Sequence, residues 1–187
     1  MINIAVISCA HHACLESANI KGRLLAEAIG ADARHKVYIP VNSKGLIASL
    51  SEADYAVIST YGGSDKLFDQ REDGSYPAIA SCASIKRFPS FDSLRLVFVL
   101  ACSAAGGQGD QNIAAALSRC IAKDGIVIAN RYTIIGTSYH YRAKNGKQGW
   151  VAYQNGRVVI SEEHFPARIT MQDVYDVFLK YRMGLIP

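Results

Sequence analysis

Cys102 is the residue in this sequence best placed to act as a nucleophile. It directly follows residues 94–101, a run that is apolar except for Arg95, and precedes the glycine-rich segment 106–109. A cysteine between a strand and a following helix would lie near the helix N-terminus, whose partial positive charge favours the nucleophilic thiolate. The alternative is structural, because free cysteine is commonly a small buried residue, here at the end of a strand.

The segment 60–63, Thr-Tyr-Gly-Gly, is a second place where chemistry is possible. It follows the apolar run Tyr55–Ser59 and contains Tyr61 and Gly62. Glycine allows a sharp turn that points backbone amides at a ligand, and such an amide can stabilise an oxyanion. The alternative is an ordinary turn from strand to loop.

Taken together, the two segments resemble the catalytic strands of caspase-like cysteine peptidases, which include caspases, gingipains, clostripain and CHAT-domain proteins. In that family one apolar strand ends in His-Gly and a later one ends in Ala-Cys or a close variant. The hairpin around Trp150 and residues 155–156 is also similar to segments of bacterial members. The resemblance covers residues 3–160 in element order. It implies a caspase-like fold, a peptide or protein ligand, Cys102 as nucleophile, Gly62 as oxyanion donor and no cofactor.

The sequence departs from the family pattern at Tyr61, which stands where the family has histidine. Histidine accepts and returns a proton near neutral pH. A phenol has an ordinary pKa of about 10 and is a poor base at neutral pH. The resemblance therefore implies a pseudoenzyme, kept as a binding or regulatory module, in which the tyrosine ring contributes to binding.

Another histidine could replace the missing base, which would leave an active cysteine peptidase. His11 and His12 follow the first predicted strand and so lie at the same sheet edge, while His140 follows the fifth. For His11 and His12 the alternative is a partly exposed pair in a loop.

Metal and phosphate sites are less well supported by the sequence. Cys9, His11, His12 and Cys14 fall within six residues, too close together to surround one ion tetrahedrally. The segment 106–110 has glycines but lacks the lysine and Ser/Thr of a P-loop. A flavodoxin-like small-molecule binder, with its ligand beside residues 106–109, is a third possibility.

The elements that must position these residues alternate between strand and helix. This pattern predicts one α/β domain over residues 1–187, a three-layer α/β/α sandwich with a mostly parallel sheet. Asn155-Gly156 predicts an antiparallel hairpin near the C-terminus. We expect strands at residues 3–8, 37–40, 55–59, 94–101, 125–130, 149–153 and 157–160. We expect helices at residues 17–29, 43–50, 78–85, 111–122 and 171–181, with an exposed loop at 65–76.

Composition limits the classes of function. The chain has 187 residues, half of them hydrophobic, and a formal charge of +4. The apolar runs are too short to cross a bilayer, and no signal peptide is recognisable. Basic residues are scattered, which argues against nucleic acid. An odd number of cysteines, five, without a secretion signal indicates free thiols and a cytoplasmic location.

Overall fold

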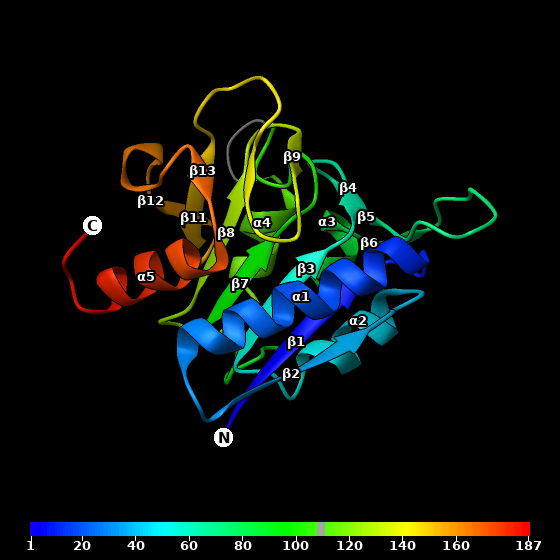
Figure 1. The fold of residues 1–187 in the computed structure, drawn as a ribbon, viewed down its shortest axis with the longest axis horizontal. Coiled ribbons are helices and arrows are strands. Elements are labelled where there is room, and N and C mark those ends of the chain that lie inside the picture. The colour runs from blue at the N-terminus through cyan, green and yellow to red at the C-terminus, as the bar shows by residue number, and fades with distance from the viewer. Residues whose placement is uncertain (108–110) are drawn as a thin grey trace.

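A seven-stranded sheet forms the centre of the computed structural model, which describes residues 1–107 and 111–187 (Figure 1). Its strand order is β12-β11-β8-β7-β3-β1-β2. Five neighbouring strands, β2, β1, β3, β7 and β8, are parallel, and β11 joins β8 in antiparallel pairing. The strands are β1 (Ile2–Ser8), β2 (Ala33–Tyr38), β3 (Tyr55–Ser59), β7 (Leu96–Val99), β8 (Ile126–Asn130), β11 (Trp150–Gln154) and β12 (Arg157–Ile160).

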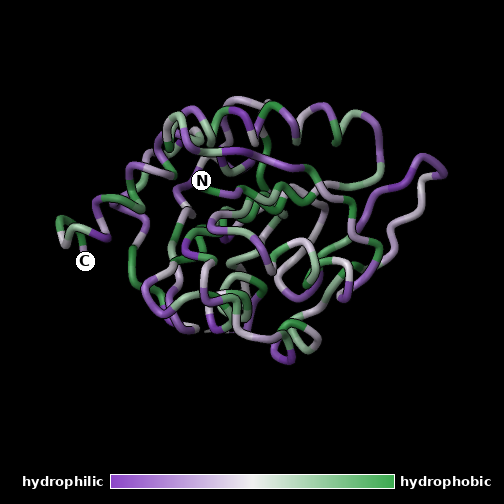
Figure 2. The backbone as a smooth tube through the Cα atoms, turned by 90° about the horizontal axis from the view of Figure 1, so that it is seen from below, coloured by the Kyte–Doolittle hydropathy of each residue, from purple (hydrophilic) through white to green (hydrophobic). Residues whose placement is uncertain are grey.

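Helices cover both faces of this sheet, so the predicted three-layer α/β/α class is confirmed. Helices α1 (His12–Ile29) and α5 (Met171–Arg182) pack on one face, where Val6 meets Leu25 and Phe178. Helices α2 (Ser43–Leu50), α3 (Cys82–Ile85) and α4 (Ile113–Ser118) pack on the other, where Ile7 meets Leu46. Burial on both faces explains why these strands are continuously apolar. In Figure 2 the hydrophobic stretches run through the middle of the molecule and the polar ones through its outer loops.

Two small antiparallel sheets extend the molecule beyond the carboxyl ends of the parallel strands. One has the order β4-β5-β6 and the other β13-β10-β9, so β4 and β9 are both edge strands. The elements are β4 (Tyr61–Gly62), β5 (Lys66–Phe68), β6 (Ala78–Ser81), β9 (Ile134–Gly136), β10 (Tyr141–Ala143) and β13 (Arg168–Ile169), with a short 3-10 helix at Glu162–His164.

The predicted C-terminal hairpin is confirmed. Strands β11 and β12 pair in antiparallel fashion, and the residues between them, Asn155 and Gly156, have φ angles of 46° and 80°. Both lie in the left-handed region that a type I′ turn requires, which explains the choice of Asn-Gly there.

Some predicted boundaries were wrong. The first helix begins at His12 instead of residue 17, and β2 covers residues 33–38 instead of 37–40. Strand β7 and helix α4 are shorter than the predicted 94–101 and 111–122. Helix ends depend on capping contacts that the apolar pattern does not encode. Here the imidazole of His11 is the N-cap of α1.

The predicted helix 78–85 was wrong in its first half, which is strand β6, and the predicted loop 65–76 contains β5. These two strands pair with each other, and Ile79 and Ala80 are buried in the hydrophobic cluster on one face of the central sheet. This pairing across the chain overrides local helix propensity. The rest of the predicted loop, residues 71–76, is exposed and projects from the body of the molecule beyond β5 and β6 (Figure 1).

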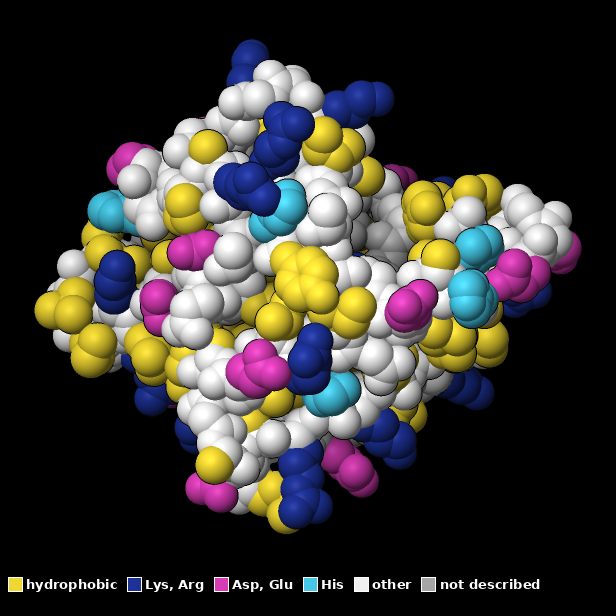
Figure 3. Space-filling model, viewed as in Figure 1, with side chains coloured by type: hydrophobic (Ala, Val, Ile, Leu, Met, Phe, Trp, Pro, Cys, Tyr) yellow, Lys and Arg dark blue, Asp and Glu magenta, His cyan; other side chains and the backbone are white. Residues whose placement is uncertain are grey.

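On the face seen in Figure 3, basic side chains gather at the top, where Figure 1 shows the loop between β10 and β11, while both charge signs mix elsewhere. Arg142 in β10 and Lys144 and Lys147 in this loop are exposed. Within the described residues, no helix combines the length and apolar character needed to cross a membrane.

Candidate functional site

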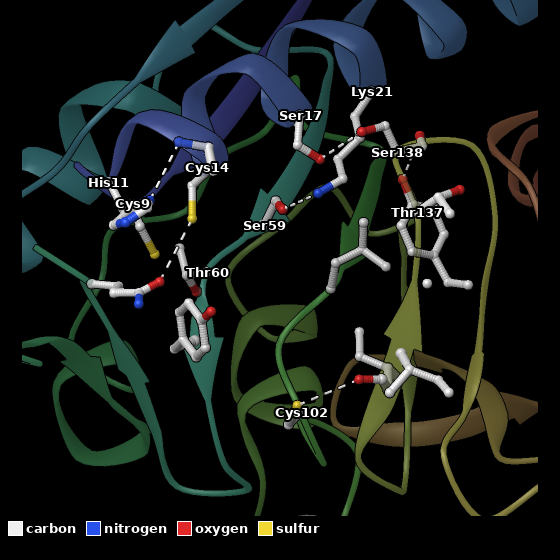
Figure 4. Close-up of a pocket in the computed structure, with 18 residues that line it drawn as sticks. Cys9, His11, Cys14, Ser17, Lys21, Ser59, Thr60, Cys102, Thr137 and Ser138 are labelled. Atoms are coloured by element: carbon white, nitrogen blue, oxygen red, sulfur yellow. Dashed lines mark hydrogen bonds between the residues drawn. The ribbon is translucent and has the colours of Figure 1, made fainter. Parts of the chain in front are cut away.

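An open pocket of about 530 Å³ lies at the carboxyl edge of the parallel sheet (Figure 4). It sits where the strand order reverses between β1 and β3, the place where open parallel sheets bind ligands. The residues that line it include Cys9 and His11 after β1, Cys14, Ser17 and Lys21 from α1, Ser59 to Tyr61 from the end of β3 and the start of β4, Leu100 and Cys102 after β7, and Ile134 to Ser138 from β9 and the turn after it.

Cys102 lies in a turn just beyond β7 and faces this pocket, as predicted. Backbone hydrogen bonds hold the turn against β8, since Ser103 N donates to Tyr132 O at 3.0 Å and Ala105 N to Asn130 O at 3.0 Å. The Sγ atom lies 3.9 Å from the carbonyl oxygen of Ile134. This contact positions the thiol beside β9.

The sequence predicted that Cys102 lies near the N-terminus of the helix that follows it. The turn that contains Cys102 is not helical, and α4 begins only at Ile113. The side chain of Asn112 caps α4 by accepting from Ala115 N at 2.9 Å. Ala114 N, in the first turn of α4, donates to Ala104 O at 3.1 Å, so this helix begins beside the turn that contains Cys102.

Tyr61 lines the same pocket from β4 and is 44 % exposed. Its ring packs edge-to-face against Tyr76, with 5.4 Å between ring centroids. Partial burial raises the pKa of the Tyr61 phenol above its ordinary value. The phenol therefore stays protonated at neutral pH and offers an amphipathic ring instead of a base.

The glycine at position 62 is explained by close packing. A Cβ atom there would lie 2.9 Å from Ala101 Cβ and 2.9 Å from Lys66 O. Gly62 thus lets β4 approach the end of β7 and brings Tyr61 near Cys102. Its role as an oxyanion donor stays a prediction.

The two N-terminal histidines have different positions. His11 lines the pocket and caps α1, with Nδ1 accepting from Ala13 N at 3.3 Å. Its Nε2 atom lies 3.6 Å from a Glu72 carboxylate oxygen. His12 is exposed as the first residue of α1, and its backbone N–H also bonds Glu72, at 2.8 Å. Of the two, only His11 is placed to contact a ligand of the pocket; it lies in the bend between β1 and α1, whereas His12 belongs to the helix.

His140 lies in the turn between β9 and β10. Its Nδ1 atom lies 2.8 Å from an Arg168 guanidinium nitrogen and 3.3 Å from the Thr137 hydroxyl. The guanidinium can only donate, so Nδ1 accepts and is not free to take a proton from Cys102.

Sequence reasoning missed Lys21 and Ser59. Lys21 is only 8 % exposed, and its Nζ atom donates to Ser59 Oγ at 2.5 Å. The ammonium also lies 5.6 Å from the centroid of the Tyr141 ring. Among the described residues no carboxylate forms an ion pair with it. Burial lowers the pKa of Lys21 to about 8.

One signal in the sequence could have found Lys21. The buried residues of α1 are Ala18, Lys21, Gly22 and Leu25, which have the spacing of one helical face. A lysine on the buried face of a helix is rare unless its ammonium group is paired, so such a position indicates a hydrogen-bond partner or a functional role.

The remaining pocket thiols are poor nucleophiles. Burial raises the pKa of Cys9 to about 11 and also raises that of Cys14. In the part of the chain that the structure describes, no three His, Cys, Asp or Glu side chains are grouped to hold a metal ion.

The phosphate-binding alternative depends partly on residues 108–110, which lie outside the described part. A Cβ at Gly106 would lie 2.9 Å from both Arg131 O and Ser103 O, so packing accounts for this glycine. At the pocket end of α1, the N–H groups of His12 and Ala13 already bond Glu72 and His11. A helix N-terminus occupied in this way offers little to a phosphate.

Comparison with models of known protein families gave no match, and a search of curated proteins gave no significant match.

Proposed function

We propose that this chain is a caspase-like protein that lacks the Cys-His dyad and binds a peptide or protein segment in the pocket between β4 and β9. The observation that carries this proposal is that Cys102 and Tyr61 line one pocket at strand ends. These are the positions where the family resemblance expects the nucleophile and the base. A phenol in place of an imidazole favours binding over cleavage.

The edges of the two small sheets support a peptide as ligand. Strands β4 and β9 each have one free edge, and residues of both line the pocket. The Ile134 carbonyl, on β9, is directed to Cys102 and not to β10. An extended peptide binds such an edge by adding a strand, with main-chain hydrogen bonds supplying affinity.

The strand order gives further support. The first strand lies beside the third in the sheet, an arrangement that caspase-like proteins share, and antiparallel β11 and β12 follow the parallel strands. The five cysteines are free, in agreement with the cytoplasmic location inferred from the sequence.

An active cysteine peptidase remains the second candidate, because His11 lines the same pocket as Cys102. Its use as a base requires Nε2 to leave Glu72. The variant His11→Asn separates the two candidates, since asparagine keeps the N-cap of α1 and removes the imidazole.

The test is an array of immobilised ten-residue peptides probed with the purified protein. Ile135→Arg, on β9 at the pocket, should abolish binding to the selected peptides. Val158→Arg is the matched control, since both side chains are about 40 % exposed on edge strands but Val158 lies on β12, away from this pocket. Equal binding by both variants, or no peptide bound above background, contradicts the proposal. Cleavage of fluorogenic peptides that His11→Asn abolishes would establish the peptidase instead.

A further inference from the structure

We infer that Ser59 and Lys21 form a nucleophile–base pair that transfers short apolar acyl groups from esters. This inference does not depend on the proposed function, because it uses neither Cys102 nor Tyr61. The two residues come from different elements, Ser59 from the last position of β3 and Lys21 from the third turn of α1. Both line the pocket at the sheet's reversal point.

The contact between them has the geometry of nucleophile activation. Lys21 Nζ lies 2.5 Å from Ser59 Oγ, within reach of direct proton transfer. In Figure 4 the two side chains point at each other across the upper part of the pocket. Pairs of serine and lysine act in this way in several unrelated hydrolases.

The surroundings of Lys21 favour its neutral form. The groups that face it are the hydroxyl of Ser59 from β3, the ring of Tyr141 from β10 and the thiols of Cys9 and Cys14 from the end of β1 and from α1. None of them is a carboxylate, and both thiols are largely protonated because burial raises their pKa values. Burial therefore dominates, and it lowers the pKa of Lys21 to about 8. A lysine with a lowered pKa can act as a general base.

The neighbouring Thr60 supplies a group that needs a partner. Its Oγ1 atom is buried without a hydrogen-bond partner in the described structure, and the residue lines the pocket. A buried hydroxyl without a partner is costly and calls for an explanation. This hydroxyl is available to donate to a ligand that enters the pocket.

The acyl transfer follows from these positions. Ser59 Oγ attacks the ester carbonyl carbon while its proton passes to the neutral amine of Lys21. The tetrahedral intermediate collapses, the carbon–oxygen bond to the leaving alcohol breaks, and the Lys21 ammonium returns the proton to that alcohol. Water then attacks the acyl-serine with Lys21 again accepting and returning one proton, which releases the carboxylic acid and restores Ser59.

The pocket defines the substrate class. Leu100, Ile134 and Ile135 form an apolar part of its lining, and the volume of about 530 Å³ is in the range that holds a small organic molecule. We therefore expect esters of short apolar acids to react and esters of charged acids to react poorly.

The first experiment is labelling with an alkyl fluorophosphonate, followed by tandem mass spectrometry to locate the modified residue. The expected site is Ser59. The labelling rate should increase with pH and level off above a midpoint near pH 8, because the neutral amine of Lys21 is the base. Labelling at another residue only, or a rate that does not change across this midpoint, overturns the inference.

Variants then test each residue. Ser59→Ala should remove the label, and Lys21→Met should lower the labelling rate by about 100-fold or more. Lys21→Arg should also fail, because a guanidinium keeps the charge but cannot act as a base. Lys44→Met, at an exposed lysine of α2, is the matched control and should label as the unaltered protein does. A Lys21→Arg protein that labels normally overturns the pair.

The two proposals fail separately. Absence of label in a protein that still binds array peptides removes this inference alone, whereas specific labelling of Ser59 without peptide binding removes the proposed function alone. If a variant does not fold, the residue labelled in the unaltered protein and the pH dependence of that labelling still test the inference.

Discussion

Cys102 and Tyr61 line one pocket from neighbouring strands, because β7 pairs in parallel with β3 and Tyr61 follows the end of β3 by two residues. Gly62 makes this approach possible by packing its backbone against Ala101. The positions that the sequence suggested for a nucleophile and a base are therefore brought together, but with a phenol in the place of the imidazole. The chemistry of this pair decides how the pocket is used.

Reactivity of the five thiols should follow their burial. We expect iodoacetamide to modify Cys102, which is partly exposed in the pocket, before Cys9, which is 0 % exposed and whose pKa burial raises to about 11. The thiolate is the reacting species, so a higher pKa slows alkylation at neutral pH. Mass spectrometry of each cysteine peptide over time measures the order, and modification of Cys9 first would contradict this account of the pocket.

Replacing Tyr61 by histidine should bring an imidazole beside Cys102. In Tyr61→His we expect alkylation of Cys102 at slightly acidic pH to increase by about tenfold or more, because a histidine–cysteine pair favours the thiolate. The measurement is the pH dependence of alkylation of Cys102 in the variant and the unaltered protein.

Tyr76→His is the matched control for this substitution. Tyr76 packs against Tyr61 and is similarly exposed, at 49 % compared with 44 %, but it does not line the pocket. The Tyr76→His substitution should leave the pH dependence of Cys102 alkylation unchanged. An equal increase in both variants would show a general effect of charge and would contradict a specific pairing at position 61.

The parallel strands and the sheet edge of the site were predictable because they depend on patterns within the sequence. Continuous apolar runs such as Tyr55–Ser59 predict strands buried on both faces, and parallel strands place their carboxyl ends at one edge. Asn155-Gly156 predicts its hairpin from backbone conformation alone. These features need no knowledge of distant contacts.

What the sequence did not reveal depends on contacts between distant segments. Strand β6 forms because it pairs with β5 and buries Ile79 and Ala80 in the core. The site residue Lys21 matters because Ser59, 38 residues away, accepts a hydrogen bond from its amine. Local propensity contains no term for such pairs. The turn that contains Cys102 is likewise held by backbone hydrogen bonds to Asn130 and Tyr132, which no local pattern encodes.

Gly62→Ala should destabilise the fold. The added methyl group would lie 2.9 Å from Ala101 Cβ and from the backbone oxygen of Lys66, so β4 must move away from β7. We expect a loss of about 1–3 kcal/mol in the free energy of unfolding, as for other overpacked sites. Urea denaturation measures it.

Gly63→Ala provides the control, because a Cβ at that position would meet no atom closer than Asp65 Oδ1 at 3.8 Å. Its free energy of unfolding should stay close to that of the unaltered protein. If Gly62→Ala were as stable as Gly63→Ala, the close approach of β4 to β7 would be contradicted.

Lys21→Met should stabilise the protein at neutral pH, and the gain should fade in alkali. Burial lowers the pKa of Lys21 from its ordinary value of 10.5 to about 8. The unfolded chain therefore holds this proton more strongly than the folded one, and the unfavourable contribution of the lysine is fully present below about pH 8. That contribution is lost as the pH rises from about 8 to 10.5, where the amine is neutral in both states.

Below pH 8 the lowered pKa of Lys21 costs the folded protein about 3 kcal/mol, which Lys21→Met would recover. The variant also loses the hydrogen bond to Ser59, which reduces this gain by about 1 kcal/mol. Urea denaturation of Lys21→Met and the unaltered protein at pH 7 and at pH 10 measures the difference directly, since all other titrating groups are common to both. Lys44→Met, exposed on α2, should show no such pH-dependent difference. A Lys21→Met protein that is less stable than the unaltered one at pH 7 would mean that Lys21 is held charged by a stronger partner than Ser59, and its use as a base at that pH would be contradicted.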